Sequence, residues 1–130
     1  MLAVPADSPL GARASVRLSD LHDQPLIGFE RRCSPDYFDA LHAAVRASAV
    51  RPRTIAELTT ETDMLALVST GAGIAIVNAC QRWRPPAAVR FVPVDDLAVS
   101  LQLALVQPAG KPSPTVRQFA DILSDLAPPG

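Results

Sequence analysis

Short apolar runs alternate with helical patterns along much of this 130-residue chain, and that alternation limits the folds open to it. In chain order the strand-like and helix-like segments are 25–29, 35–48, 54–58, 61–70 and 74–78. Such an order is typical of helices covering both faces of a mostly parallel sheet. The sequence therefore predicts an α/β fold.

Both internal helices carry signals at their expected starts. Ser34 followed by Pro35 has the pattern of an N-cap and a proline at the first helical position. Thr60 and Asp63 have the spacing of a capping box. We expect Ser34 and Thr60 to cap the two helices.

The glycines of LVSTGAGIAIVNA raise the question of a phosphate-binding loop. A dinucleotide loop follows a strand and opens a helix, whereas Gly71 and Gly73 follow a helix and precede a strand. The third fingerprint position is Ile76 instead of glycine. We therefore expect Gly71 to end the helix and the pair to form a tight connection, with no nucleotide site.

The last third of the chain has a different pattern. Residues 89–94 read as an edge strand, because Pro93 cannot donate to a ladder. From Val99, leucines at alternate positions through Leu105 predict a long strand with one apolar face. Ser113-Pro114 then opens a helical pattern that ends at Leu126.

Composition excludes several classes of protein. The formal net charge is -1 and the basic residues are scattered apart from one Arg-Arg pair, so the chain has no electrostatic footprint for nucleic-acid contact. The two cysteines, Cys33 and Cys80, have neither metal-ligand nor disulfide-framework spacing. No leader pattern or membrane-length apolar stretch is visible. We expect a soluble cytoplasmic protein without membrane contact, metal or cofactor.

The ordered set of segments resembles the effector-binding domain of LysR-type transcriptional regulators. The stretches that carry the resemblance are PADSPLGAR, DQPLIGFERRCSPDYFDAL, ELTTETDMLALVSTGAGIAIVNA, RFVPVDD and LQLALVQPAGKPSPTVRQFADIL, which together span nearly the whole chain. The resemblance implies two α/β subdomains like those of type II periplasmic binding proteins, with a small effector in the cleft between them. It implies no enzymatic activity.

The resemblance also implies a domain division. Residues 1–14 correspond to a crossover segment, 15–95 to an essentially complete second subdomain, and 96–130 to a return strand and C-terminal helix of the first subdomain. Most of that first subdomain and the DNA-binding segment have no counterpart here. The apolar faces of the return strand and last helix then lack their partners, so we expect a homodimer or strand-exchanged oligomer.

Candidate effector-binding residues follow two predicted strands. The loop containing Arg31, Arg32, Cys33 and Ser34 joins a strand to a helix N-terminus, where ligands bind in open α/β sheets and where two guanidinium groups suit a carboxylate or phosphate. The alternative is that the arginines are solvated or paired with Glu30 or Asp36.

A second cluster, Thr60 and Glu61, starts the next helix, and Phe29 ends the first strand. For these residues capping, favourable charge at the helix end and core packing are the alternatives to effector contact.

Three hypotheses for function remain open. The first is a sensing domain that binds a small, anionic metabolite and contributes to dimerisation. The second is an effector-free interaction module or remnant. The third is a thiol-dependent enzyme or redox sensor using Cys33, which lies near a helix N-terminus beside two arginines. Neither His22 nor His42 is placed by sequence to serve as its base, so no catalytic residue is assigned.

Overall fold

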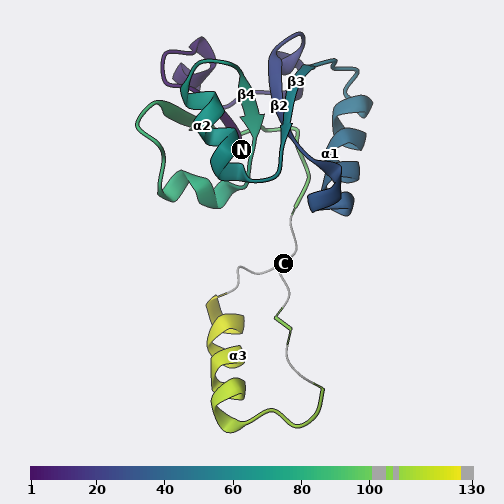
Figure 1. Cartoon of the computed structure of the whole chain (residues 1–130), viewed down its shortest axis with the longest axis vertical. Helices are drawn as coiled ribbons and strands as arrows, with labels where there is room; N and C mark the ends of the chain where they lie inside the picture. Colours follow the sequence, from purple (N-terminus) through teal and green to yellow (C-terminus); the bar gives the residue numbers. More distant parts are fainter. Residues whose placement is uncertain (101–104, 107–108, 127–130) are drawn as a thin grey trace.

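The computed structural model describes residues 1–100, 105–106 and 109–126. Five strands form one mixed sheet in the spatial order β3-β2-β4-β1-β5 (Figure 1). The strands are β1 (Leu2–Pro5), β2 (Pro25–Phe29), β3 (Arg53–Leu58), β4 (Ile74–Ile76) and β5 (Val89–Val92). The α-helices are α1 (Pro35–Ala47), α2 (Glu61–Ser69) and α3 (Pro114–Leu126). The predicted α/β class and the helices at 35–48, 61–70 and 114–126 are confirmed.

The sheet is less parallel than its sequence pattern indicates. β2 pairs in parallel with β3 and β4, but β1 pairs antiparallel with both β4 and β5. β1 lies within the segment expected to be a crossover, and no strand was predicted there. Its four residues are too few to show an alternating pattern, and its partners lie far away in the sequence.

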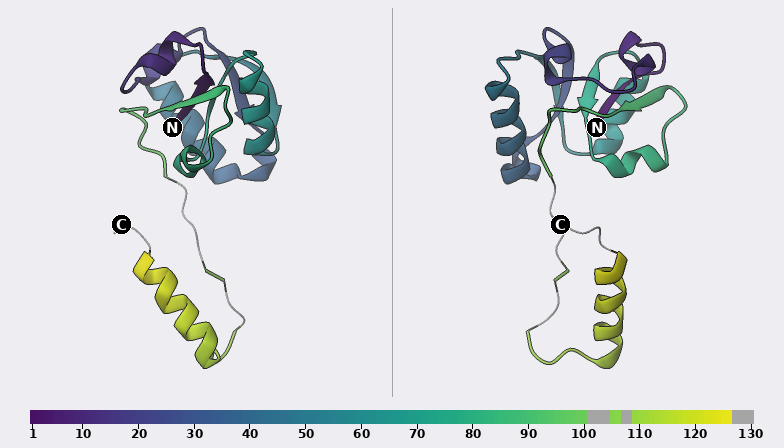
Figure 2. Two further views of the ribbon diagram at one scale, coloured as in Figure 1. Left: turned by 90° about the vertical axis from the view of Figure 1, so that its left-hand side faces the viewer. Right: turned by 180° about the vertical axis from the view of Figure 1, so that it is seen from behind.

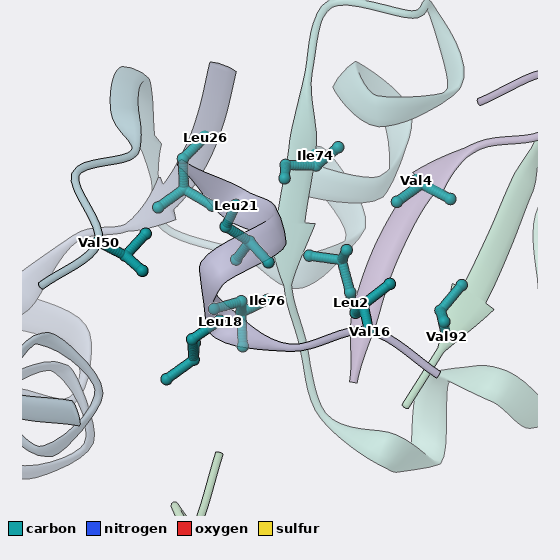
Figure 3. Close-up of a cluster of buried hydrophobic side chains, with 10 residues drawn as sticks. All are labelled: Leu2, Val4, Val16, Leu18, Leu21, Leu26, Val50, Ile74, Ile76 and Val92. Carbon is teal, nitrogen blue, oxygen red and sulfur yellow. The ribbon is translucent and has the colours of Figure 1, made fainter. Parts of the chain in front are cut away.

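Successive residues of the inner strands bury their side chains on opposite faces of the sheet. Leu2 and Val4 join one apolar cluster, whereas Ala3 joins the other. The first cluster lies beneath the segment 8–22 and is closed by Leu18 and Leu21 (Figure 3). The second lies beneath α2, which contributes Met64, Leu65 and Val68. Both faces of the sheet are therefore covered.

The two internal helices begin differently. At α2, the Asp63 backbone N–H donates to Thr60 Oγ1 at 3.1 Å, and the Thr60 hydroxyl donates to the Asp63 carboxylate at 2.7 Å. The predicted Thr60 cap is confirmed. At α1, Ser34 occupies the N-cap position with φ -156° and ψ 81°, and its side chain makes no capping hydrogen bond. The prediction that Ser34 caps this helix through its side chain is wrong.

The Gly-x-Gly segment has the predicted structural role. Gly71 has φ +81° just beyond the end of α2, a conformation that glycine adopts at little cost. Gly73 precedes β4, and a Cβ atom there would lie 2.5 Å from the Pro25 carbonyl oxygen. One glycine supplies a turn, and the other permits close packing of β4 against the start of β2.

The C-terminal part is only partly described. The predicted edge strand is confirmed as β5, and the Pro93 carbonyl accepts from the Val16 N–H at 2.9 Å. Most of the predicted return strand falls on residues 101–104 and 107–108, outside the described residues. α3 stands apart from the sheet in all three views (Figures 1 and 2). Within the described ranges, no helix has the length and apolarity needed to cross a membrane.

Replacing Gly73 with alanine should destabilise the chain more than replacing Gly71. In G73A the new methyl group would collide with backbone atoms, at a cost of about 1–3 kcal/mol, with further loss if β4 shifts. In G71A nothing lies within 4 Å of the new methyl, so the cost is the backbone strain of a positive φ, about 1 kcal/mol. Urea unfolding of both variants measures the difference, and a smaller loss for G73A would contradict the close-packing role.

Candidate functional site

The site lies at the edge of the sheet where the parallel strands β2 and β4 end. α1 begins six residues beyond the end of β2, and α2 begins after β3 at the same edge. Parallel strands bring their carboxyl ends together, and ligands of open α/β sheets bind there. Two strand ends and two helix starts thus converge on one place.

A pocket of about 190 Å³ occupies this edge. Its walls come from the end of β2, the start of α1, the start of α2 and the end of β4, through Phe29, Cys33, Ser34, Tyr37, Glu61, Met64, Ile76 and Asn78. Four residues singled out from the sequence therefore share one pocket: Phe29, Cys33, Ser34 and Glu61. Arg31, Arg32 and Thr60 do not line it.

Glu61 is the best-connected polar side chain of the pocket. Its Oε1 accepts from the backbone N–H and from the side-chain amide of Asn78, each at 2.8 Å. Its Oε2 accepts from Gln81 Nε2 at 2.6 Å. The carboxylate therefore ties the start of α2 to the segment that leaves β4 and sets the shape of the pocket wall.

The start of α1 offers hydrogen-bond donors to the pocket. Pro35 has no N–H, and the Phe38 N–H donates to the Ser34 carbonyl at 2.9 Å. The N–H groups of Asp36 and Tyr37 have no acceptor among the described residues. Because Ser34 does not cap the helix, its hydroxyl and these two amides remain available to an oxygen atom of a ligand.

The two arginines are engaged in ion pairs on the surface. Arg31 forms a bidentate pair with Asp39, with Nε and Nη2 at 2.9 and 2.7 Å from the two carboxylate oxygens. Hydrogen bonding to Arg31 lowers the pKa of the Asp39 carboxyl below its ordinary value. Arg32 pairs with Glu30, which is one of the two partners that the sequence suggested as the alternative to ligand binding. In this structure both guanidinium groups point their donors at the protein's own carboxylates.

Tyr37 and Asn78 were not assigned to the site from sequence. Tyr37 was counted with the apolar face of its helix, yet it is half-buried in the pocket wall. Burial raises the pKa of its phenol, and the nearby Glu61 carboxylate adds to that shift. The position of Tyr37 in the first turn of α1, beside a candidate loop, was the available signal.

A second hollow of about 280 Å³ adjoins the first. Tyr37, Ile76 and Asn78 line both, and the second extends to Leu97 and Val99 on the segment leaving the sheet. The two hollows are therefore neighbours and share part of their walls. They lie at the edge at which the family resemblance expects the other subdomain.

Cys33 is exposed at the pocket. His22 instead lies 3.6 Å from Asp23 and accepts from the Arg51 N–H at 3.4 Å, and His42 stacks on Phe38. No interaction within the described ranges joins either imidazole to the thiol. Nor does the described part of the chain contain three His, Cys, Asp or Glu side chains grouped to hold a metal ion.

Comparison with known proteins gives a consistent result. The family model for the LysR substrate binding domain matches residues 1–128. The HTH-type transcriptional regulator AlsR of Bacillus subtilis is 24% identical over 94% of this chain and 40% of its own length. The small neutral protease regulatory protein of Streptomyces coelicolor is 34% identical over 78% of this chain and 30% of its own length. The chain thus spans well under half the length of these relatives.

Solved structures agree on the fold. The regulatory domain of CcmR from Synechocystis PCC6803, in complex with 2-PG, superposes with a TM-score of 0.73 at 18% identity, over 96% of this chain and 61% of that one. The BenM effector binding domain with its effector benzoate gives 0.68 at 23% identity, over 99% and 62%. The QuiR effector binding domain in complex with shikimate gives 0.61 at 20% identity, over 92% and 56%.

Removing the Glu61 carboxylate should destabilise the edge of the sheet. Glu61→Ala leaves the Asn78 backbone N–H without its acceptor, at an expected cost of about 1–3 kcal/mol. Glu61→Gln keeps one carbonyl acceptor and should cost less. Asp7→Asn, at an exposed residue, serves as the matched control. Chemical unfolding measures the series, and an E61A variant as stable as D7N would contradict the bridging role of Glu61.

Proposed function

This chain belongs to the LysR substrate binding domain family, and from that premise we propose that it senses a small organic anion for a transcriptional regulator. Members of this family are regulators and not enzymes, so Cys33 needs no catalytic role. One feature carries the proposal: the pocket at the ends of β2 and β4, with donors at the start of α1 that have no acceptor among the described residues. Structural relatives bind 2-PG, benzoate and shikimate in domains of the same fold.

The arrangement of donors supports an anionic ligand. A carboxylate placed at the start of α1 would accept from the Asp36 and Tyr37 amides and the Ser34 hydroxyl, and the helix dipole would favour its charge. The apolar body of the ligand would lie against Phe29, Met64 and Ile76. Because Glu61 keeps acceptor capacity on Oε2, a hydroxyl group on the ligand has a partner as well.

The remaining residues of the loop act around this pocket. Thr60 does so indirectly, because its cap fixes the start of α2 and so the position of Glu61. Arg31 and Arg32 stand on the loop that borders Cys33 and Ser34. We propose that they exchange their surface carboxylate partners for the ligand, a change that costs little because exposed ion pairs contribute about 0–1 kcal/mol.

The working context follows from the family. We propose that the chain acts in the cytoplasm, that it makes no direct contact with DNA or a membrane, and that ligand occupancy is transmitted through a dimer. A ligand can shift a dimer's geometry only through a difference in its affinity for two states.

One observation favours a second function. α3 exposes a row of large apolar side chains, with Phe119 56% and Leu126 74% accessible. Such a surface is typical of protein interaction sites. An interaction module without an effector is therefore the alternative function, with α3 as its contact surface.

Small acids should stabilise the chain, and neutral analogues should not. Benzoate and shikimate serve as probes in thermal unfolding, with benzamide as the neutral control.

Ser34→Ala should weaken acid binding about threefold to tenfold through the loss of one hydrogen bond. Arg31→Ala should weaken it further than Arg84→Ala, a change at an exposed arginine outside the site. Equal stabilisation by benzoate and benzamide would contradict an anion site, and equal affinities of R31A and R84A would remove Arg31 from it.

Native mass spectrometry separates the two functions. At low micromolar concentration, a dimer that carries a small-molecule adduct supports the sensing domain and gives the mass of the ligand. A dimer without adduct, together with no stabilisation by acids, supports the interaction module. A compact monomer would contradict both versions of dimerisation.

A further inference from the structure

A groove of about 260 Å³ lies between α1 and the strands β2 and β3. We call it the α1–β3 groove, and its walls are mainly apolar, with Leu26, Phe38, Leu41, Val45 and Val50 among them. Its volume is close to the lower limit for small-molecule pockets, about 300 Å³. No residue of α1 is buried, although Leu41 and Val45 pack against the apolar cluster of the sheet. The helix therefore leaves room on its inner side for a small apolar molecule.

The floor of the groove is open because residue 28 has no side chain. Gly28 lies two residues beyond Leu26 on β2, so a side chain there would project from the same face of the sheet. The nearest atoms to an added Cβ would lie at 3.6–3.9 Å, which is ordinary van der Waals distance. Gly28 is also not among the glycines with a positive φ. Neither packing nor backbone conformation therefore requires a glycine at this position, and its effect is to keep the groove open.

The groove is narrow and has a flat aromatic wall. Phe38 and His42, one turn apart on α1, stack with their ring centroids 3.9 Å apart and an angle of 25° between the ring planes. On β3 the groove is lined by Thr54 and Glu57, which lie three residues apart. At ~3.3 Å per residue of strand, the groove is about 10 Å long. A flat body of one or two rings matches this length and can pack against the aromatic wall.

Two arginines stand at one end of the groove. Arg46 lies in the last turn of α1 and Arg51 lies just before β3, so both line the groove where β3 begins. Neither forms an ion pair within the described part of the chain. The backbone of Arg51 is held in place, because its N–H donates to His22 Nδ1 at 3.4 Å and its carbonyl accepts from the Asp23 N–H at 3.2 Å. The groove thus ends in two cations on fixed backbone.

The carboxylates near these arginines leave them available to a ligand. Both oxygens of Asp39 are held by Arg31, whose hydrogen bonds lower the pKa of Asp39 most, and the charge of Arg46 adds less to that shift. Glu57 lines the groove three residues along β3 from Thr54, away from the arginine end. Its charge repels a ligand carboxylate from that end, so the groove has a direction.

The arginine end is separate from the effector pocket. That pocket lies at the carboxyl ends of β2 and β4, whereas Arg46 and Arg51 flank the amino end of β3, which pairs in parallel with β2. Neither arginine lines the pocket of about 190 Å³. An anion held by these arginines would therefore occupy a different place from an anion at the start of α1.

We propose that the α1–β3 groove is a second small-molecule site, which binds a flat apolar monocarboxylate of one or two rings. The rings lie over Gly28 and against the aromatic wall. The carboxylate accepts hydrogen bonds from Arg46 and Arg51, and the burial of apolar surface supplies the rest of the affinity. The site does not depend on the effector pocket.

The charged end of the site is tested with 2-naphthoate as the probe and 2-naphthamide as its neutral control. In titration calorimetry the wild type should bind naphthoate about tenfold more tightly than the amide, or tighter still. The variant R46A/R51A should lose this preference. The matched control R82A/R84A, at exposed arginines outside the groove, should keep it.

The open floor is tested with Gly28→Val. The valine side chain should fill the groove and weaken naphthoate binding about tenfold or more, because the rings lose the apolar surface on which they lie. The unfolding temperature should not fall, since valine favours a strand and the added Cβ meets only ordinary contacts. Stabilisation by benzoate through the effector pocket should be unchanged.

The outcomes separate this site from the effector pocket. Equal naphthoate affinity of the wild type and R46A/R51A would overturn the groove assignment, as would no binding by the wild type at millimolar concentration. Binding that is lost in Ser34→Ala instead would show that the probe occupies the effector pocket. Self-association that Gly28→Val abolishes, without naphthoate binding, would make the groove a protein interface and overturn the ligand site. Naphthoate binding that depends on Arg46 and Arg51, without any stabilisation by benzoate, would overturn the effector pocket and leave the groove intact.

Discussion

The parallel pairing of β2 with β4 is the constraint on which the rest of the molecule depends. It brings the carboxyl ends of two strands to one edge of the sheet. The start of α1, which follows β2, and the start of α2, which follows β3, lie at that same edge. The pairing requires β4 to approach β2 closely, which is possible because residue 73 has no side chain. Both strands bury side chains on opposite faces, so a shift of register would expose one of the two apolar clusters. The core therefore fixes where the pocket lies, and the hydrogen bonds of Glu61 shape its wall.

The sequence predicts local structure well because local signals decide it. Helix α2 was predicted from Thr60 and Gly71, and both act as expected. Ser34 has the same kind of signal, but its backbone takes a conformation in which the side chain does not reach the helix amides. Two serines in the same Ser-Pro context thus behave differently, because Ser113, before Pro114, does cap α3 through its hydroxyl. The Ser-Pro pattern alone therefore does not decide whether the serine caps its helix.

The sequence did not predict the contacts between segments that lie far apart in the chain. The antiparallel insertion of β1 between β4 and β5 depends on pairing across most of the chain. Likewise Arg31 pairs with Asp39, about one turn into α1, whereas the sequence suggested Glu30 or Asp36 as partners of the two arginines. Pocket composition was partly predictable: the residues after β2 and at the start of α2 were identified, but Tyr37 and Asn78 were not. Which face of a helix turns inward is settled by the whole core.

Residues of helix α1 line two hollows, the pocket of about 190 Å³ at the strand ends and the α1–β3 groove of about 260 Å³ along β2 and β3, and the two have walls in common. Phe29, Tyr37 and Ile76 line both of them. A rigid-body shift of α1 that widens one hollow must therefore change the other. A ligand whose binding moved α1 would therefore reshape the larger groove as well, and a molecule in that groove would then change the ligand's affinity by the same factor. Of the shared residues only Tyr37 stands on α1, so its side chain is the point at which such a shift would reach both hollows.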